Sequence, residues 1–178
     1  MSVYMPMSTT VRHNKITGTI FSAIVDLLRK NEVYATHEEC ALVHWGFKRK
    51  NDFTYLVDIP SIDDINYFTN ITINELDYVL PDFILFKENP YLCNNRETKI
   101  AGCPDLIIEV WSDSNSTEER NFKLGLYSSS PIVEHWYIDQ DSNEIICYIG
   151  DNKAENQSLH NILETSNGLK FDLRYLAI

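Results

Sequence analysis

The spacing of apolar and polar residues divides the chain into two amphipathic helices and a set of strands. From His13 to Lys30 the apolar residues recur at intervals of three and four, which is the period of an amphipathic helix. A second helix is predicted to begin at Ser116, because Ser116 and Glu119 have the spacing of a capping box, and to end at Ser128–Pro131. The polar tract 48–75 has little periodicity and predicts an inserted loop.

Runs rich in apolar, β-branched and aromatic residues predict the strands. They cover Glu32–Phe47, Tyr78–Phe86, Asp105–Trp111, Val133–Ile138, Glu144–Ile149 and Gly168–Leu176. The second run is apolar throughout, which is typical of one strand buried on both faces, and Pro81 within it belongs at an edge, a bulge or the start of the strand. Residues 139–143 join their flanking strands as a hairpin, and residues 87–103 form a long connection. This order predicts an α/β (α+β) fold with a mixed central sheet flanked by helices.

Length, hydrophobicity and charge narrow the class of protein. The 178 residues suit a single domain over 1–178, and a hydrophobic fraction of 44% supports a core. No apolar stretch approaches the ~20 residues that span a bilayer and the N-terminus lacks a signal-peptide pattern, so we expect a cytoplasmic protein without a membrane partner. None of the four cysteines forms a C-x-x-C pair, which favours free thiols over a zinc site. The net charge of −11 weighs against a protein that coats nucleic acid, although a cation in an acidic cleft can invert the local field of a nuclease.

Two acidic residues lie at the ends of apolar runs, where an unpaired carboxylate would be costly to bury. Asp82 opens its strand and Glu109 closes its own. If the two strands are antiparallel neighbours, which are ~4.8 Å apart, the two carboxylates meet and form a hard oxygen site suited to Mg²⁺ or Mn²⁺. Asp105 precedes Glu109 by roughly 13 Å along the strand, so we expect Asp105 to cap a turn or hold the strand entrance.

A lysine follows on the second helix. Lys123 falls in its second turn, and its ammonium would reach the metal if the helix packs back over the sheet. There it would orient or deprotonate the attacking water, or stabilise the phosphate in the transition state. Structural interpretations stay open: a proline before Asp82 is a common turn opening, Lys123 is of a type usual on a solvated helix face, and His13 is more typical of a helix cap or the surface than of a catalyst.

Five sequence blocks, in this order, resemble the Uma2 (DUF820) family of restriction-endonuclease-like proteins. They are His13-Asn14-Lys15 to Leu28, Leu80-Pro81-Asp82, Pro104 to Ser112, Lys123-Leu124-Gly125-Leu126-Tyr127 and Val133 to Asp139. The resemblance covers about residues 10–150 as the core and leaves 150–178 as a C-terminal extension. It implies the PD-(D/E)xK nuclease fold, in which acids on two core strands bind the metal, and these match Asp82 and Glu109. The position two residues after the second acid, usually lysine, is Trp111 here, whereas the family's lysine on the next helix matches Lys123.

The residues and the resemblance together predict a metal-dependent endonuclease that hydrolyses phosphodiester bonds in DNA. Asp82 and Glu109 would hold Mg²⁺ (or Mn²⁺), and Lys123 would be the catalytic lysine. Cutting both strands of a duplex needs two sites, which favours a homodimer. The alternative, which the acidic charge favours, is a non-catalytic binding or assembly module on the same fold, and a third reading, a small-molecule hydrolase, would need a closed pocket.

Overall fold

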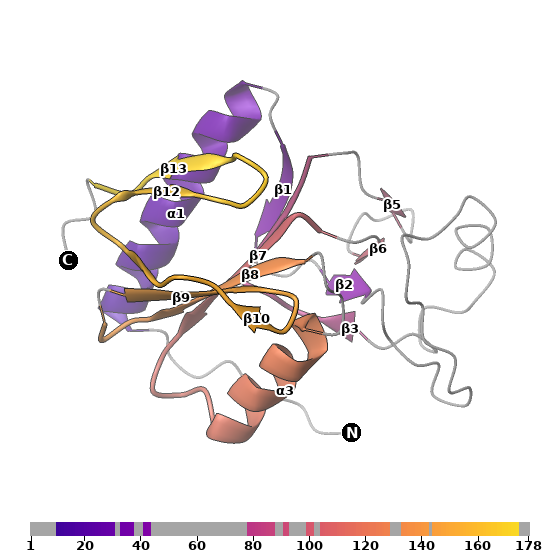
Figure 1. The fold of residues 1–178 in the computed structure, drawn as a ribbon, viewed down its shortest axis with the longest axis vertical. Helices are drawn as coiled ribbons and strands as arrows, with labels where there is room; N and C mark the ends of the chain where they lie inside the picture. Colours follow the sequence, from indigo (N-terminus) through magenta and orange to yellow (C-terminus); the bar gives the residue numbers. More distant parts are fainter. Residues whose placement is uncertain are drawn as a thin grey trace.

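The structure is a mixed sheet with a helix on each face (Figure 1). It is a computed structural model that describes residues 10–30, 33–37, 41–43, 78–87, 91–92, 99–101, 104–128, 133–142 and 144–174. The two helices are α1 (Val11–Arg29) and α3 (Thr117–Tyr127). The expected α+β class with a mixed central sheet is confirmed, and both predicted helices form close to their expected bounds.

The main sheet runs in the order β1-β4-β7-β8-β9-β10, and β11 pairs with β9 as well. The strands are β1 (Tyr34–His37), β4 (Phe83–Phe86), β7 (Leu106–Trp111), β8 (Glu134–Asp139), β9 (Glu144–Ile149), β10 (Asn152–Lys153) and β11 (Gln157–Ser158). β7 and β8 are parallel, with α3 as the crossover between them, whereas β4 pairs antiparallel with β7 and β9 with β8. The predicted hairpin of β8 and β9 is confirmed.

Helix α1 covers one face of this sheet. It begins at the N-cap Thr10, whose hydroxyl accepts a hydrogen bond from the amide of His13 at 3.0 Å. Its buried apolar stripe packs against sheet residues of the same cluster; the stripe consists of Ile16, Ile20, Ile24 and Leu27. Of the helices in the described part of the chain, none is both long and apolar enough to cross a bilayer.

Helix α3 covers the opposite face. Ser116 is its N-cap and accepts from the amide of Glu119 at 3.1 Å, as the capping-box spacing predicts. Tyr127 in its last turn is fully buried in a second apolar cluster with Ile107. Because neighbouring strand residues point to opposite faces, Ile108 belongs to the cluster under α1 instead. Glu109, next in β7, therefore points towards α3.

The C-terminal part of the chain returns to cover α1. β12 (Ile162–Glu164) and β13 (Lys170–Asp172) form a hairpin that lies beside α1 (Figure 1). Phe171 packs edge-on against Trp136 at a ring-centroid distance of 5.6 Å. The predicted strand Gly168–Leu176 is confirmed for Lys170–Asp172, and its last two residues lie outside the described residues.

Two predicted strands were wrong in extent. The run Tyr78–Phe86 is not one strand: β3 (Tyr78–Val79) belongs to a separate sheet of order β3-β2-β6-β5, and Pro81, which lacks an amide hydrogen, separates it from β4. The run Glu32–Phe47 contains β1 and β2 (Ala41–Val43) in different sheets. The predicted connection 87–103 carries β5 (Tyr91–Leu92) and β6 (Lys99–Ala101). The predicted loop 48–75 lies outside the described residues.

Candidate active site at the end of strand β7

The pairing of β4 with β7 sets the geometry of the site. The two strands are antiparallel, as expected, with Phe83 opposite Ile108. Continuing this register by one residue places Asp82 opposite Glu109, and by two residues Pro81 opposite Val110. The start of one strand and the end of the other therefore bring the two predicted acids face to face.

An aspartate carboxylate binds a backbone amide at each end of the β4–β7 ladder. Pro81 stands opposite Val110, and the amide of Val110 donates instead to the carboxylate of Asp82 at 2.6 Å. At the other end the amide of Asp105 donates to the carbonyl of Leu85 at 2.9 Å, and the amide of Lys87 donates to the carboxylate of Asp105 at 2.6 Å. The repeated Pro-Asp dipeptide is thus one structural device used twice: each aspartate carboxylate accepts from a backbone amide of the neighbouring strand at one end of the ladder.

The surroundings of the two aspartates differ. Asp82 lies at the end of the ladder that holds Glu109. Asp105 lies at the other end, where the side-chain amide of Asn167 donates to it at 2.9 Å. The prediction that Asp105 holds the strand entrance is confirmed by these contacts.

Glu109 is the most deeply buried acid of the site, with 2% of its surface exposed. The ammonium of Lys123 donates to its Oε2 at 2.8 Å, and the hydroxyl of Tyr127 donates to its Oε1 at 2.5 Å. Lys123 also reaches the carbonyl of Leu80, just before Pro81, at 3.4 Å. Helix α3 therefore packs back over the sheet as expected, and it directs two polar side chains at one carboxylate.

Burial controls the protonation of this cluster. Removal from water raises the pKa of Glu109 from 4.5 to about 7. The charge of Asp82 adds to this rise, and Lys123 and Tyr127 only partly oppose it. For Lys123, burial alone lowers the pKa, but the charge and hydrogen bond of Glu109 outweigh it, and the pKa is raised above 10.5. Lys123 is accordingly a protonated donor at neutral pH.

Comparison with known proteins assigns the chain to a family. The sequence model described as "Uma2: Putative restriction endonuclease" matches residues 63–176, which is more than half of the chain. The chain belongs to the Uma2 family. The matched region includes Asp82, Glu109, Lys123 and Tyr127, whereas α1 with His13 precedes it.

A solved structure shows the same fold as this Uma2 chain. It is described as a "putative nuclease belonging to DUF820" from Anabaena variabilis ATCC 29413. The TM-score is 0.58 at 14% sequence identity, and the alignment covers 98% of this chain and 84% of that chain. At this identity the likeness shows the fold alone. No curated protein matches the chain.

The donor set of the Uma2 chain fits a small hard cation. Within the residues that the structure describes, no three His, Cys, Asp or Glu side chains gather closely enough to hold a metal ion. Mg²⁺, however, commonly uses one or two carboxylates and completes its shell with waters and substrate phosphate oxygens. Asp82 and Glu109 supply two such carboxylates, and a cation near both would offset burial and the charge of Asp82, which together raise the pKa of Glu109. The residues present therefore fit Mg²⁺ or Mn²⁺.

Neither the role of Tyr127 nor the contact made by His13 was predicted from the sequence. Tyr127 follows Lys123 by four residues, so both share a helix face, and this spacing was the signal that would have found it. The Nε2 of His13 lies 3.1 Å from the carbonyl of Val110, 97 residues away in the chain. No local pattern reveals such a contact.

Aromatic residues support the site beneath Glu109. Tyr137 of β8 is the partner of Glu109 in the parallel ladder. The Nε2 of His135 lies 2.8 Å from the carbonyl of Gly150, which can only accept, so Nε2 carries the hydrogen and Nδ1 accepts from the hydroxyl of Tyr137 at 2.9 Å. Burial lowers the pKa of His135 to about 4, so the ring is neutral. The hydrogen-bonded pair of His135 and Tyr137 beneath Glu109 is therefore uncharged.

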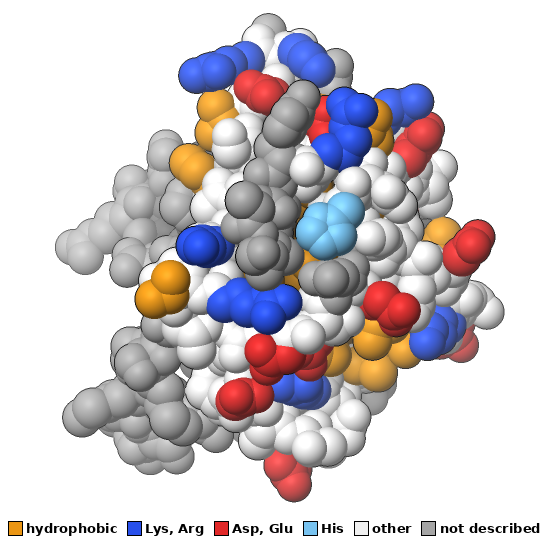
Figure 2. Space-filling view, turned by 90° about the vertical axis from the view of Figure 1, so that its left-hand side faces the viewer, with side chains coloured by type: hydrophobic (Ala, Val, Ile, Leu, Met, Phe, Trp, Pro, Cys, Tyr) orange, Lys and Arg blue, Asp and Glu red, His pale blue; other side chains and the backbone are white. Residues whose placement is uncertain are grey.

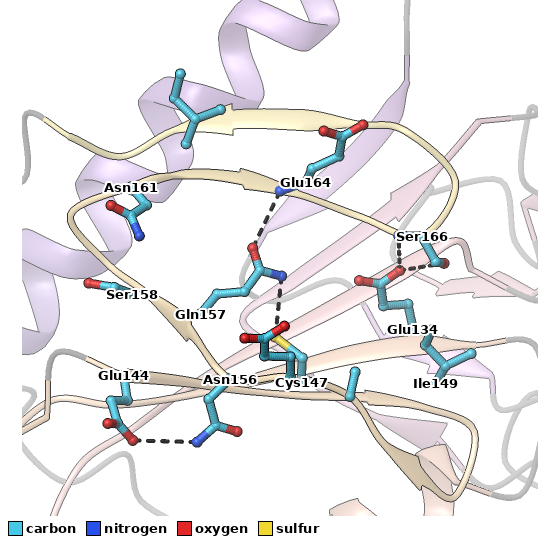
Figure 3. A pocket seen from close by; sticks show the side chains of 13 residues that line it. Glu134, Glu144, Cys147, Ile149, Asn156, Gln157, Ser158, Asn161, Glu164 and Ser166 are labelled. Carbon is cyan, nitrogen blue, oxygen red and sulfur yellow. Dashed lines mark hydrogen bonds between the residues drawn. The ribbon is translucent and has the colours of Figure 1, made fainter.

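A separate hollow of about 630 Å³ lies between β9 and the segments around β11 and β12 (Figure 3). None of Asp82, Glu109 and Lys123 lines it. The buried carboxylate of Glu134 at its edge accepts from the indole of Trp136 at 2.7 Å and from the amide and hydroxyl of Ser166. The lining groups thus bind one another, and the hollow is distinct from the site on β7.

Proposed function

We propose that this Uma2 protein is a metal-dependent endonuclease that hydrolyses phosphodiester bonds in DNA. Asp82 and Glu109 would hold Mg²⁺ or Mn²⁺, and Lys123 would contact the phosphate. The observation that carries the proposal is the buried Glu109, which lies opposite Asp82 in the ladder and is bound by Lys123 at 2.8 Å. Burying an acid beside a second acid is costly in free energy. A buried acid with a shifted pKa and a cation directed at it is typical of a functional site.

The chain's own residues divide the work. A divalent cation, when bound, polarises a phosphoryl oxygen and lowers the pKa of an attacking water. Asp82 and Glu109 supply the negative charge that attracts this cation. Because the pKa of Lys123 is raised, its ammonium is suited to neutralising charge on the phosphate rather than to removing a proton from water.

The distribution of charge bears on how DNA would bind. The chain has a net charge of −11. On the face that carries α1 and the β12–β13 hairpin, the described Lys and Arg side chains are scattered among Asp and Glu and form no continuous basic tract (Figure 2). We therefore expect weak binding to DNA without metal, and a strong dependence of binding on the cation held at the site.

The repeated Pro-Asp device gives the test a matched control. Asp82→Asn and Asp105→Asn each weaken the same kind of carboxylate-to-amide contact at a ladder end, but only Asp82 lies opposite Glu109. With Mg²⁺ or Mn²⁺ and supercoiled plasmid, we expect Asp82→Asn, Glu109→Gln and Lys123→Met to lower the cleavage rate about 100-fold or more, and Asp105→Asn to retain it. Nicked or linear first products would distinguish a single site from two cooperating sites. Cleavage that survives all three site substitutions contradicts the proposal.

The second candidate is a non-catalytic module that uses the same cluster as a structural network. It is favoured by one observation: both oxygens of Glu109 already accept hydrogen bonds, from Lys123 and from Tyr127. Calorimetric titration with Mn²⁺ separates the two candidates. Binding that is lost in Asp82→Asn and kept in Asp105→Asn supports the nuclease, whereas an absence of binding at millimolar Mn²⁺ supports the module.

A further inference from the structure

We propose that His13 is a positioning residue for the acidic end of β7. Its Nε2–H holds the carbonyl of Val110, and this contact fixes the segment on which Glu109 and the Asp82-bound amide are carried. The inference rests on the proposed function only for its consequence in catalysis. Its structural part stands on contacts between protein groups alone.

The backbone carbonyl of Val110 has no hydrogen-bond donor opposite it on strand β4. The carbonyl of Trp111 accepts from the amide of Gln140 beyond β8 at 2.9 Å, so Val110, one residue earlier, directs its amide and carbonyl to the β4 side. The residue opposite Val110 on that side is Pro81, which has no amide hydrogen to give. The carbonyl of Val110 therefore needs a donor from outside the ladder.

His13 supplies that donor from α1. Its Nε2 lies 3.1 Å from the Val110 carbonyl, and because a carbonyl can only accept, Nε2 carries the hydrogen. The two backbone groups of Val110 are thus held by two side chains: the amide by Asp82 and the carbonyl by His13. Since both groups belong to the residue directly after Glu109, releasing either one frees the end of β7.

The ring of His13 is itself held in place. The amide of His13 donates to the hydroxyl of Thr10 at 3.0 Å, and this hydroxyl donates to the side-chain oxygen of Gln140 at 2.5 Å. The amide of Gln140 in turn binds the carbonyl of Trp111. The start of α1 is therefore fastened to β7 directly at Val110 and, through Gln140, at Trp111.

Burial points to the same role. His13 is 8% exposed, and its Nδ1 has no hydrogen-bond partner among the residues that the structure describes. A buried ring nitrogen without a partner has a cost, which an apolar side chain at this position would avoid. The bond from Nε2 to Val110 is the polar contact that the ring makes within the described part of the chain, and it accounts for a histidine there.

Two isosteric variants isolate the Nε2 contact. In His13→Gln the side-chain amide nitrogen takes the place of Nε2, whereas in His13→Asn it takes the place of Nδ1. Amide hydrogen exchange of the metal-free full chain would be followed at Val110, with the core amides of Trp136 and Cys147 as references. We expect protection of Val110 to stay close to wild type in His13→Gln and to fall about ten-fold relative to the references in His13→Asn.

A purely structural role gives another pattern. Equal loss of protection at Val110 and at the reference amides, or equal behaviour of the Gln and Asn variants, overturns the proposal. The second readout is plasmid cleavage with Mn²⁺, for which we expect His13→Asn to lower kcat with little change in KM for DNA, and His13→Gln to restore it.

The two readouts separate this inference from the proposed function. If the exchange pattern appears but the wild-type protein neither binds Mn²⁺ nor cuts DNA, the positioning role stands and the nuclease proposal fails. If wild type cuts DNA and Asp82→Asn does not, while the two His13 variants match each other in exchange and in kcat, the nuclease proposal stands and the positioning role fails.

Discussion

At the scale of single residues, Glu109 gathers the strongest interactions of the site. Its carboxylate is bound by a cation from Lys123 and by a phenol from Tyr127, and both partners come from the same face of α3. Lys123 fixes Oε2 and Tyr127 fixes Oε1. The carboxylate therefore has one orientation before any cation or substrate arrives.

Replacing Tyr127 by Phe removes the hydrogen bond that favours the ionised form of Glu109. The pKa of Glu109 should rise further above its value of about 7, because Tyr127 is one of the groups that lower it. A ¹³C NMR titration of the Glu109 carboxyl carbon would measure the change. Tyr137→Phe is the matched control, since that hydroxyl binds His135 instead. Identical titrations in the two variants would show that the Tyr127 contact has no such effect.

The raised pKa of Glu109 also links stability to pH. The folded state holds the proton up to about pH 7, whereas the unfolded chain loses it near 4.5, so the folded state binds more protons within this window. Stability from this group is therefore fully present below pH 4.5 and is lost as the pH rises towards 7, with a slope of up to about 1.4 kcal/mol per pH unit.

Glu109→Gln should remove that slope. Urea unfolding between pH 4.5 and 8 would give the free energy of unfolding for wild type and variant, and their difference isolates Glu109. His135, whose pKa is lowered to about 4, loses stability in the opposite direction as the pH falls below 6.5, and it is present in both proteins. Parallel profiles for wild type and Glu109→Gln would contradict the assigned shift.

At the scale of elements, the position of α3 decides whether Lys123 and Tyr127 reach Glu109. The helix is fixed at its start by the Ser116 cap. One turn later the guanidinium of Arg120 donates to the carbonyl of Ser112 at 2.8 Å. Both contacts join the helix to the loop that leaves β7. The loop that follows the strand of Glu109 therefore also fixes the position of α3.

Ser116→Ala should destabilise the protein by about 1 kcal/mol through loss of the N-cap. Thr117→Ala, at the exposed first residue of the helix, is the control and should change stability by less than about 0.5 kcal/mol. Thermal or urea unfolding would measure both. A cost for Ser116→Ala no larger than for Thr117→Ala would mean that the cap contributes nothing.

Some of these elements could be predicted from the sequence, and others could not. Helix α3 and strand β7 carry strong local signals, a capping box and an uninterrupted apolar run, and with the antiparallel β4 they placed Asp82, Glu109 and Lys123 near one another. The apolar run around Pro81 was misjudged because hydrophobicity alone does not show where a ladder stops. β10, β11 and β12 are two or three residues long, which is too short for a period.

The contacts of His13 depend on pairings between distant segments. The spacing of the first helix shows which face is buried, but not which strand end its first turn meets. The function of the Pro-Asp repeat was equally hidden: the dipeptide was visible twice, yet only the structure shows that each aspartate accepts from a backbone amide of the neighbouring strand.

At the scale of the whole molecule, the cluster that contains α1 also contains residues near the C-terminus. Leu163, Leu169, Phe171 and Leu173 are buried with Ile16 and Trp136. The tail from β12 to β13 thus covers the helix that carries His13. The stability of the site end of β7 should depend on residues far from it in sequence.

Phe171→Ala should cost about 3–5 kcal/mol, because it leaves a cavity beside Trp136. Ile162→Ala, at a half-exposed position of the paired strand, is the control and should cost far less. Urea unfolding followed by tryptophan fluorescence would measure both. Similar values for the two variants would show that the hairpin is not part of the cooperative core.

Pro81, at the end of the β4–β7 ladder, also limits how the chain can misfold. Sliding one strand by two residues keeps each apolar side chain on its original face, so burial alone does not forbid the error. In the direction that brings Pro81 opposite Ile108, the proline has no amide hydrogen to give and would interrupt the hydrogen bonds of the ladder. A misfolded intermediate in which Asp82 no longer lies opposite Glu109 is thereby disfavoured. Pro81, which ends the ladder beside Glu109, thus also opposes one error in the alignment of the two strands.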